Sequence, residues 1–450
     1  MAFTSTSSTP RQRIAVIGSG IAGMSAAWLL SQRHEVSLYE KDGRLGGHTN
    51  TVNIATESGD VAVDTGFIVF NDITYPNLVA LFEHLAVTSK ASNMSFGVSL
   101  DGGKFEYSSV DAASFLSGGV NLARPRFWSM TLDLLRFYRT APRDLPATRA
   151  DLVSLGDYLT ARGYGEAFRR DHLLPQAAAI WSAPLAEIQH YPACAFVRFF
   201  ENHGLLKLSG RPKWRTVEGG ARAYIDKLTA PYADNIRLGA GAVSVRREGG
   251  GVWVRDARGQ AERFDHVVIA AHANQALAML DDPSESESDL LGAFRYAKNR
   301  AVLHTDPMLM PRRRRAWASW NYVGDNPNGG CVVSYWMNNL QGLACKEDIF
   351  LTLNPQRQPR EDTVLYDTEY EHPLFDARAL RAQERLWSLQ GQRNTWYCGA
   401  HFGAGFHEDG LQAGLAVAEQ LGGVRRPWSV ADESGRIHLP PASQALEQAA

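Results

Sequence analysis

The amino-acid sequence predicts an α/β protein whose parallel sheet is assembled from separated parts of the chain, with an inserted α+β domain between them. Three observations indicate this fold class. An apolar, β-branched run at Ile14–Ile17 leads into a glycine-rich turn and an apolar helical segment. A second run of this type, Val267–Ala271, lies in the middle of the chain. A third strand, loop and helix pattern begins at Trp396. Such continuous apolar runs are typical of strands buried on both faces of a parallel sheet.

Composition excludes several classes of protein. The chain has 450 residues, with 46 Lys and Arg against 48 Asp and Glu, so no broadly basic nucleic-acid-binding surface is expected. The four cysteines are far apart and no histidine has ligand spacing with them, which predicts reduced thiols and no metal. Residues 1–10 lack the apolar core of a secretion signal, so we expect a disordered leader and a cytoplasmic protein. The apolar stretch Ile14–Leu30 is short for a membrane span and is interrupted by glycines.

The first strand, turn and helix carry a nucleotide-binding fingerprint. Gly18, Gly20 and Gly23 form G-x-G-x-x-G between strand and helix. The first glycine makes a tight turn, the second lets the backbone approach a pyrophosphate, and the third allows the helix to pack closely on the strand. The helix N-terminus at Ile21 and Ala22 offers N–H groups and a positive dipole to the phosphates. The pattern predicts a Rossmann-like dinucleotide site.

An acidic residue ends the second predicted strand, Glu35–Glu40. Glu40 follows Gly23 by 17 residues, close to the spacing expected of an acid that accepts hydrogen bonds from a ribose diol. An acid at this position argues against a 2′-phosphate on the nucleotide.

The loop after this strand favours a flavin over a nicotinamide. Arg44 can serve an anionic phosphate, and the adjacent glycines that follow Leu45 allow close backbone contact. A later turn, Asp64–Phe67, can abut an isoalloxazine ring. We see no second glycine-rich βαβ unit for a nicotinamide. The sequence thus predicts FAD, with contacts from this region by Lys41, Arg44, Gly46, Gly47, His48, Gly66 and Phe67.

These motifs resemble the superfamily of flavin amine oxidases and phytoene desaturases, which includes protoporphyrinogen oxidase. The resemblance extends to Arg215–Gly220, to a strand at Ile236–Arg247 and, most specifically, to Trp396–Gly414. It implies further cofactor contacts by the backbone of Val243 and by Gly399, Asp409, Gly410 and Leu411. A helix N-terminus near the pyrimidine end of the flavin would stabilise its reduced, anionic form. The tail motif and Trp317–Tyr322 also resemble a narrower bacterial group of predicted flavoproteins associated with modified fatty acids.

The separated motifs define the expected domains. An FAD-binding domain comprises residues 11–75, 213–285 and 391–425, and a substrate domain comprises 76–212 and 286–390. Residues 426–450 are expected to form a loosely held C-terminal tail.

Two features of the inserted domain have more than one interpretation. Apolar residues cover most of the helix expected after Pro125, which is therefore either deeply buried or borders a lipophilic cavity; they are Phe127, Trp128, Met130, Leu132, Leu134, Leu135, Phe137 and Tyr138. The dense cationic run Arg312–Arg315 is either a solvated loop or a patch that meets anionic lipid headgroups.

A bound flavin accepts hydride, so the protein must align a C–H bond with it and exclude water. His401 and His407 fall in the motif that closes over the flavin and are the candidate catalytic residues. Amine oxidases of the superfamily carry a lysine near the flavin. The corresponding candidate, Lys298, precedes the apolar run of its strand instead of lying within it, which argues against amine oxidation.

The sequence favours an FAD-dependent oxidoreductase that removes hydride from a lipophilic substrate, such as a modified fatty-acyl lipid. An oxygen-using amine oxidase and a non-catalytic flavin-binding partner protein are the alternatives.

Overall fold

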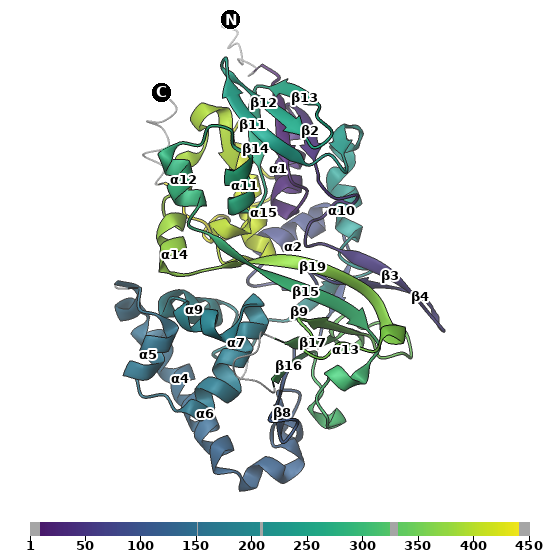
Figure 1. Ribbon diagram of the computed structural model, residues 1–450, viewed down its shortest axis with the longest axis vertical. Helices are drawn as coiled ribbons and strands as arrows, with labels where there is room; N and C mark the ends of the chain where they lie inside the picture. The colour runs from purple at the N-terminus through teal and green to yellow at the C-terminus, as the bar shows by residue number, and fades with distance from the viewer. Residues whose placement is uncertain (1–9, 151, 208–209, 325–331, 441–450) are drawn as a thin grey trace, which may run out of the picture.

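The computed structural model describes residues 10–150, 152–207, 210–324 and 332–440, and almost all of the expected leader lies outside these ranges (Figure 1). A five-stranded parallel sheet lies at one end of the molecule, in the order β10, β2, β1, β14, β20. These strands are β10 (Ile236–Arg237), β2 (Glu35–Tyr39), β1 (Arg13–Ile17), β14 (His266–Ile269) and β20 (Thr395–Tyr397). The predicted α/β class is therefore confirmed.

Two helices follow the glycine-rich motifs at the two ends of the chain. Helix α1 (Ile21–Ser31) lies on the parallel sheet, and α15 (His407–Gln420) packs against α1. Their approach is close, because a Cβ on Gly414 would lie 2.2 Å from the carbonyl oxygen of Ala22. Both helices are buried along nearly their whole length, which explains why the apolar character of the first motif shows no helical period.

The strand expected at Ile236–Arg247 is divided in two. Its first residues form β10 of the parallel sheet, whereas β11 (Ala242–Glu248) belongs to a separate antiparallel sheet with β12 (Gly251–Asp256) and β13 (Ala261–Phe264). A register shift between Ala242 and Ser244 accompanies the start of this second sheet.

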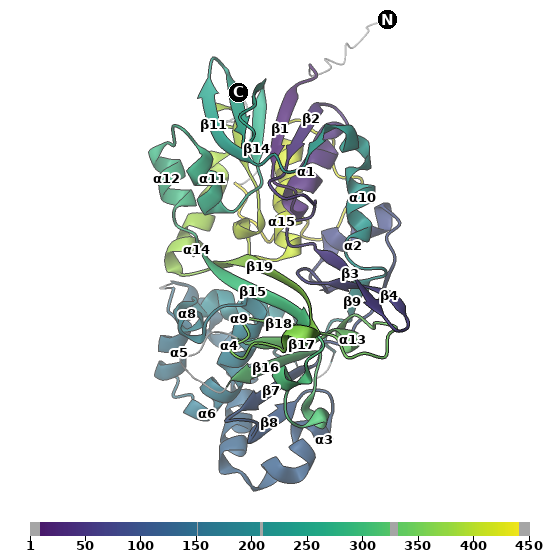
Figure 2. The same ribbon diagram turned by 45° about the vertical axis from the view of Figure 1, so that its right-hand side comes forward.

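A seven-stranded mixed sheet forms the other half of the molecule. Its order is β19 (Val364–Leu374), β15 (Arg295–His304), β18 (Phe350–Leu353), β17 (Val333–Trp336), β16 (Trp320–Gly324), β7 (Phe96–Leu100) and β8 (Phe105–Ser108). The long pair β15 and β19 crosses the molecule between the parallel sheet and the helices of the inserted part (Figures 1 and 2).

Helices occupy the lower side of this second half, away from the parallel sheet (Figure 2). They include α4 (Pro125–Ala150), α5 (Leu155–Ala161), α6 (Glu166–Phe168), α7 (Leu174–Trp181), α8 (Leu185–His190) and α9 (Ala193–Asn202). Smaller elements join the two halves: the hairpin β3 (Thr51–Thr56) and β4 (Gly59–Asp64), the sheet of β5 (Phe70–Asn71), β9 (Trp214–Val217) and β6 (Ser89–Ala91), and the helices α2 (Pro76–His84) and α10 (Ala223–Thr229). Among the described residues, no helix is long and apolar enough to cross a bilayer.

The expectation of a loosely held tail is wrong for residues 426–440. The indole of Trp428 stacks on that of Trp28, with ring centroids 5.9 Å apart, and Ile437 is buried. The side chain of Arg426 is fully buried and pairs with Glu419 of α15 at 2.8 Å. The segment is polar in composition, but specific ion pairs and two aromatic rings fix it to the domain. Residues 441–450 lie outside the described residues.

Helix α4 is neither wholly buried nor the wall of an internal cavity. It packs on α9 through one face, on which Phe127, Met130 and Phe137 are fully buried. On the opposite face Trp128 and Leu132 are exposed, because α4 is an outer helix.

Candidate functional site

Four segments converge at the carboxyl-terminal edge of the parallel sheet. Parallel strands end at the same edge, and β1, β2, β14 and β20 are in register. The N–H of Gly18 donates to the carbonyl of Tyr39 at 2.8 Å, and the N–H of Ala270 donates to that of Ile17 at 2.8 Å. This edge is where doubly wound sheets bind their ligands.

The glycines of the first motif have different surroundings. A Cβ on Gly18 would lie 2.6 Å from the carbonyl oxygen of Ala270, and a Cβ on Gly23 would lie 2.0 Å from that of Gly18. These two glycines are thus required by the packing of the protein itself. A Cβ on Gly20 would meet no protein atom within 4 Å. Gly20 therefore fits the role of a glycine that leaves room for a pyrophosphate.

The N-terminus of α1 faces the same space. Gly20 is its N-cap, no side chain caps the helix, and its first turn contains no acidic residue. Ile21 and Ala22, both predicted contacts, form this first turn. The N–H groups and the positive end of the helix dipole suit an anionic phosphate.

Glu40 lies against the glycine turn. One carboxylate oxygen accepts hydrogen bonds from the N–H and the hydroxyl of Ser19, at 2.9 and 2.5 Å, and the other accepts from the N–H of Asp42 at 2.9 Å. The structure thus brings Glu40 beside the phosphate turn, where a ribose would follow the pyrophosphate. The ribose bond itself stays a prediction.

The arginine and glycine loop covers the same turn. The N–H of Gly46 donates to the carbonyl of Ser19 at 3.1 Å, and a Cβ on Gly47 would lie 3.3 Å from the Cα of Gly20. Arg44 is half-buried, and its guanidinium donates to the carbonyl of Thr49 at 3.3 Å.

Lys41 and Val243 lie at the outer end of this loop. Lys41 is exposed, and its Cβ would be 2.6 Å from a Cβ on Gly241. Val243 is 50% exposed at the bulged start of β11, next to the loop that carries Glu40. Both residues are therefore near the expected nucleotide end of the site.

A second group of residues predicted to contact the flavin or substrate lies together around His48 and His407. The N–H of Phe67 donates to the carbonyl of His48 at 2.8 Å, and a Cβ on Gly66 would lie 2.0 Å from the same oxygen. The ring of Phe67 stacks on that of His407, and Nε2 of His407 lies 2.8 Å from the hydroxyl of Tyr224. Burial lowers the pKa of His407 to about 3, so the imidazole is uncharged at neutral pH.

The C-terminal motif lies directly on the first one. A Cβ on Gly410 would be 3.1 Å from the side chain of Ile21, and Leu411 is fully buried. Gly399 follows β20, and a Cβ there would lie 2.7 Å from Nδ1 of His401. Burial lowers the pKa of His401 to about 3, and its Nε2 has no hydrogen-bond partner within the described part of the chain.

The side chain of Asp409 is engaged within the protein. Its carboxylate accepts a hydrogen bond from the N–H of Phe406 at 2.7 Å and pairs with Arg436 at 2.7 Å. Burial raises the pKa of Asp409, and the charge of Arg436 opposes that rise. The side chain thus caps its own helix and is paired within the protein. A contact of Asp409 with the cofactor would come from its backbone and stays a prediction.

The expectation that Lys298 lies near the flavin requires a correction. Its side chain is 67% exposed, and its ammonium pairs with Glu369 on the neighbouring strand at 3.0 Å. The structure does not bring it together with His401 or His407, because it lies on the outer face of the β15 and β19 pair. The early position of Lys298 in its strand places it where the pair is open to solvent.

Sequence reasoning missed a cluster of partly buried polar side chains around His48. The ring of His48 lies 5.2 Å from those of Tyr370 and His372 and 6.1 Å from that of His272. Nδ1 of His272 lies 3.2 Å from a carboxylate oxygen of Glu371. Burial, followed by the charges of His372 and His272, lowers the pKa of His48 well below its ordinary value.

A positional signal for His272 was present in the sequence. His272 follows the predicted strand Val267–Ala271 and so falls at the ligand-binding edge. Tyr370, Glu371 and His372 lie on β19, whose approach to this edge no local pattern indicates.

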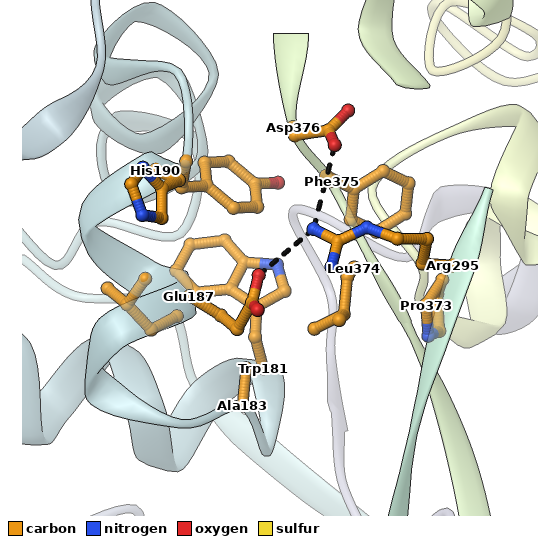
Figure 3. A pocket seen from close by; sticks show the side chains of 11 residues that line it. Trp181, Ala183, Glu187, His190, Arg295, Pro373, Leu374, Phe375 and Asp376 are labelled. Carbon is orange, nitrogen blue, oxygen red and sulfur yellow. Dashed lines mark hydrogen bonds and ion pairs between the residues drawn. The ribbon is translucent and has the colours of Figure 1, made fainter. Parts of the chain in front are cut away.

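A hollow lies between the helices of the inserted part and the end of β19 (Figure 3). In it, the guanidinium of Arg295 lies between the carboxylates of Glu187 and Asp376, at 3.0 and 3.6 Å. Apolar and aromatic residues such as Trp181 and Phe375 line the rest. The residues of the glycine turn do not line this hollow, so we do not assign the cofactor to it.

The glycine turn, the bare helix N-terminus, the acid of the second strand and the closing C-terminal helix define a dinucleotide-dependent oxidoreductase fold of the flavin type. Comparison with known families gives the same class. The family of flavin-containing amine oxidoreductases matches residues 21–305, more than half of the chain. The protein belongs to this family of flavin-containing enzymes.

Solved structures with the same fold cover nearly the whole chain. A putative protoporphyrinogen oxidase from Exiguobacterium sp. 255-15 has a TM-score of 0.66 at 15% identity, over 92% of this chain and 99% of its own. A fatty acid isomerase from P. acnes that produces CLA has a TM-score of 0.65 at 15% identity, over 91% and 98%. Cyclohexylamine oxidase from Brevibacterium oxydans IH-35A has a TM-score of 0.62 at 16% identity, over 92% and 100%. At these identities the likeness concerns the fold alone.

Proposed function

We propose that this protein binds FAD and removes hydride from a lipophilic substrate, a modified fatty-acyl lipid, in a desaturation or dehydrogenation. The bound flavin would supply a hydride acceptor. Gly20 and the N-terminus of α1 would hold the pyrophosphate, and Glu40 would hold the ribose. His48, Phe67 and His407 would border the ring and exclude water from it.

The observation that carries this proposal is that acidic side chains near the carboxyl-terminal edge of the parallel sheet already have hydrogen-bond or ion-pair partners within the protein. Asp64 accepts hydrogen bonds from the N–H of Ala221 at 2.9 Å and from the amide of Gln341 at 2.7 Å. Glu408 accepts from the N–H groups of Asn77 and Leu78, both at 3.0 Å. Both carboxylates therefore accept hydrogen bonds from backbone N–H groups of the protein itself.

Two further carboxylates lie near His407 and His48. Asp409 pairs with Arg436, and Glu371 faces His272. Within the described part of the chain, Asp64, Glu408 and Asp409 thus already have partners among the protein's own groups. An unpaired buried charge is costly, so the edge favours an uncharged substrate.

Aromatic packing leads from the inserted helices to this edge. Phe199 of α9 stacks on Phe406, the N-cap of α15, with centroids 4.8 Å apart, and on His203 at 3.8 Å. Trp181 and Phe196 extend the cluster into the helices. Phe199, Trp181 and Phe196 are buried, and apolar packing this close to His407 supports a lipophilic substrate. The resemblance of Trp317–Tyr322 to flavoproteins associated with modified fatty acids supports the same class.

The test begins with the visible spectrum of the purified protein, which should show bound oxidised flavin. Anaerobic stopped-flow mixing with fatty-acyl lipids and with amines then identifies the donor. We expect bleaching by acyl lipids. Rapid bleaching by an amine alone would refute the lipid assignment and favour an amine oxidase. A flavin that every donor leaves oxidised would favour a non-catalytic binding protein, and a preparation that stays colourless with excess FAD would refute FAD binding.

A further inference from the structure

The outer face of α4 presents a line of apolar side chains to solvent. Trp128, Leu132 and Leu135 are 44%, 65% and 41% exposed. Spacings of four and three residues place them in one stripe along the helix. Phe127, Met130 and Phe137, on the other face, are fully buried, so the protein's own core cannot take up the stripe.

The stripe continues onto the segment before α4. Val120 and Leu122, in the 3₁₀ segment η1 (Ser117–Ala123), are 46% and 50% exposed. The indole N–H of Trp128 donates to the carbonyl of Leu122 at 2.9 Å, which holds the ring beside η1. We call these five residues, Val120, Leu122, Trp128, Leu132 and Leu135, the apolar stripe.

Arginines extend the same helical line. Arg139 and Arg143 follow Leu135 at spacings of four residues, and both are exposed. Neither forms an ion pair with any residue in the described ranges. The acids that could neutralise them are already engaged, because Asp133 pairs with Arg136 at 3.1 Å and Asp144 pairs with Arg162 at 2.5 Å.

The run Arg312–Arg315 is less available than its sequence suggests. Arg313 pairs with the buried Glu106 at 3.0 Å, and Arg314 pairs with Asp348 at 2.7 Å and lies over the ring of Trp317. The run is nevertheless near the stripe, because η5 (Arg314–Ala316) packs on α3 (Ala112–Phe115), which packs on η1. It adds positive charge to this end of the molecule.

We propose that η1 and α4 form a docking surface for an anionic phospholipid bilayer. The apolar stripe would enter the boundary between headgroups and acyl chains, with Trp128 at the interface, and Arg139 and Arg143 would contact lipid phosphates. Partly exposed apolar residues beside unpaired arginines are the pattern of a helix that lies in the interface plane. The buried inner face of α4 keeps the helix attached to the protein, so the contact is peripheral.

Charge and position favour a membrane over a second copy of the chain. A second copy would bring its own arginines to the contact, whereas an anionic bilayer complements them. The helices lie at the end of the molecule opposite the parallel sheet, away from the nucleotide-binding half (Figures 1 and 2). The inner side of α4 packs on α9, whose Phe199 reaches Phe406 beside the candidate site. The surface therefore lies one helix layer from where a lipid substrate would react.

The test is co-sedimentation of the oxidised full-length protein with vesicles of phosphatidylglycerol and phosphatidylcholine, and with phosphatidylcholine alone. No donor is added, so the result is independent of the proposed reaction. We expect binding to the anionic vesicles that added salt weakens. The double variants Leu132→Gln with Leu135→Gln, and Arg139→Gln with Arg143→Gln, should each reduce the partition coefficient by about tenfold or more.

Matched controls change exposed residues of the same types elsewhere. Val364→Gln with Leu365→Gln removes two exposed apolar side chains of β19, and Arg33→Gln with Arg255→Gln removes two exposed arginines of the other half. Both controls should sediment like the wild type, and all variants should keep its flavin content and thermal midpoint. The proposal is overturned if wild-type protein ignores anionic vesicles, or if the controls release it equally. It is also overturned if the stripe variants bind vesicles like the wild type but have a different oligomeric mass in sedimentation velocity. The apolar stripe would then be a contact between two copies of the chain.

Discussion

The imidazole of His407 lies parallel to the phenyl ring of Phe67, with ring centroids 3.8 Å apart and planes 7° from parallel. This stack joins the first residue of α15 to the turn after β4, and the bond from His407 to Tyr224 adds α10. One uncharged side chain thus connects three parts of the chain that are distant in sequence.

His407→Phe should keep the stack and lose the contacts of Nε2 with Tyr224 and Thr49, at 2.8 and 3.4 Å, so FAD affinity should stay close to that of the wild type. His407→Ala should weaken FAD binding by roughly 0.5–1.5 kcal/mol, the value of an aromatic pair. Fluorescence titration of apoprotein with FAD measures both. Lys298→Met is the control, because its exposed ammonium should not affect FAD binding or flavin reduction. If His407→Phe and His407→Ala lost equal FAD affinity, the stack on Phe67 would not contribute to FAD binding.

Gly20→Val should prevent FAD binding, whereas Gly23→Val should prevent folding. At Gly20 a Cβ would meet no atom of the described residues within 4 Å, so the variant should fold with an unchanged apoprotein midpoint and bind no FAD. At Gly23 a side chain would overlap the carbonyl of Gly18, so the variant should not fold. Circular dichroism and the visible spectrum separate the two results. A Gly20→Val protein with a full complement of FAD would place the pyrophosphate elsewhere.

Glu40→Ala should weaken FAD binding by roughly 1–3 kcal/mol, through lost ribose bonds and a loosened Ser19 turn. Glu35→Ala, at the exposed other end of β2, is the matched control and should bind FAD like the wild type. Calorimetric titration of apoprotein provides the comparison. Unchanged affinity in Glu40→Ala would remove Glu40 from the site.

Arg436→Met should destabilise the protein by about 3–5 kcal/mol, because Asp409 would stay buried without its partner. The side chain of Asp409 is fully buried and that of Arg436 is 18% exposed. Arg425→Met is the control: its side chain is 58% exposed, so its pairs should contribute at most about 1 kcal/mol. Denaturant unfolding at neutral pH measures both. Adding Asp409→Asn should restore part of the loss if the ion pair is its cause.

His203→Phe tests the pH dependence of stability. Burial lowers the pKa of His203 from 6.5 to about 3, an effect that Arg436 reinforces. The unfolded chain therefore binds a proton between these values that the folded protein does not. Stability from the neutral imidazole is present above pH 6.5 and is lost as the pH falls below it.

Relative to His203→Phe, the wild type should lose at most about 1.4 kcal/mol of unfolding free energy for each pH unit below this point. Urea unfolding between pH 4 and pH 8 checks the difference. The exposed His190→Phe serves as control and should follow the wild-type curve. Parallel curves for wild type and His203→Phe throughout would contradict the burial of a neutral His203.

The sequence by itself determined the parts of the site that depend on short stretches of chain. Strand, glycine turn, helix and terminal acid obey fixed local geometry, so Gly18, Gly20, Gly23 and Glu40 could be assigned to the edge from their spacing. The C-terminal motif could be assigned from its resemblance to a family, although not its exact contacts.

Only the tertiary structure decided the contacts made between distant segments. Arg436 neutralises Asp409, β19 brings Glu371 and His372 to His48, and α4 leaves its stripe exposed because its neighbours cover one face only. The polar composition of the last residues predicted a loose tail, whereas ion pairs and a tryptophan stack hold it. The physical reason is that burial and pairing depend on which surfaces meet, and no local pattern contains that information.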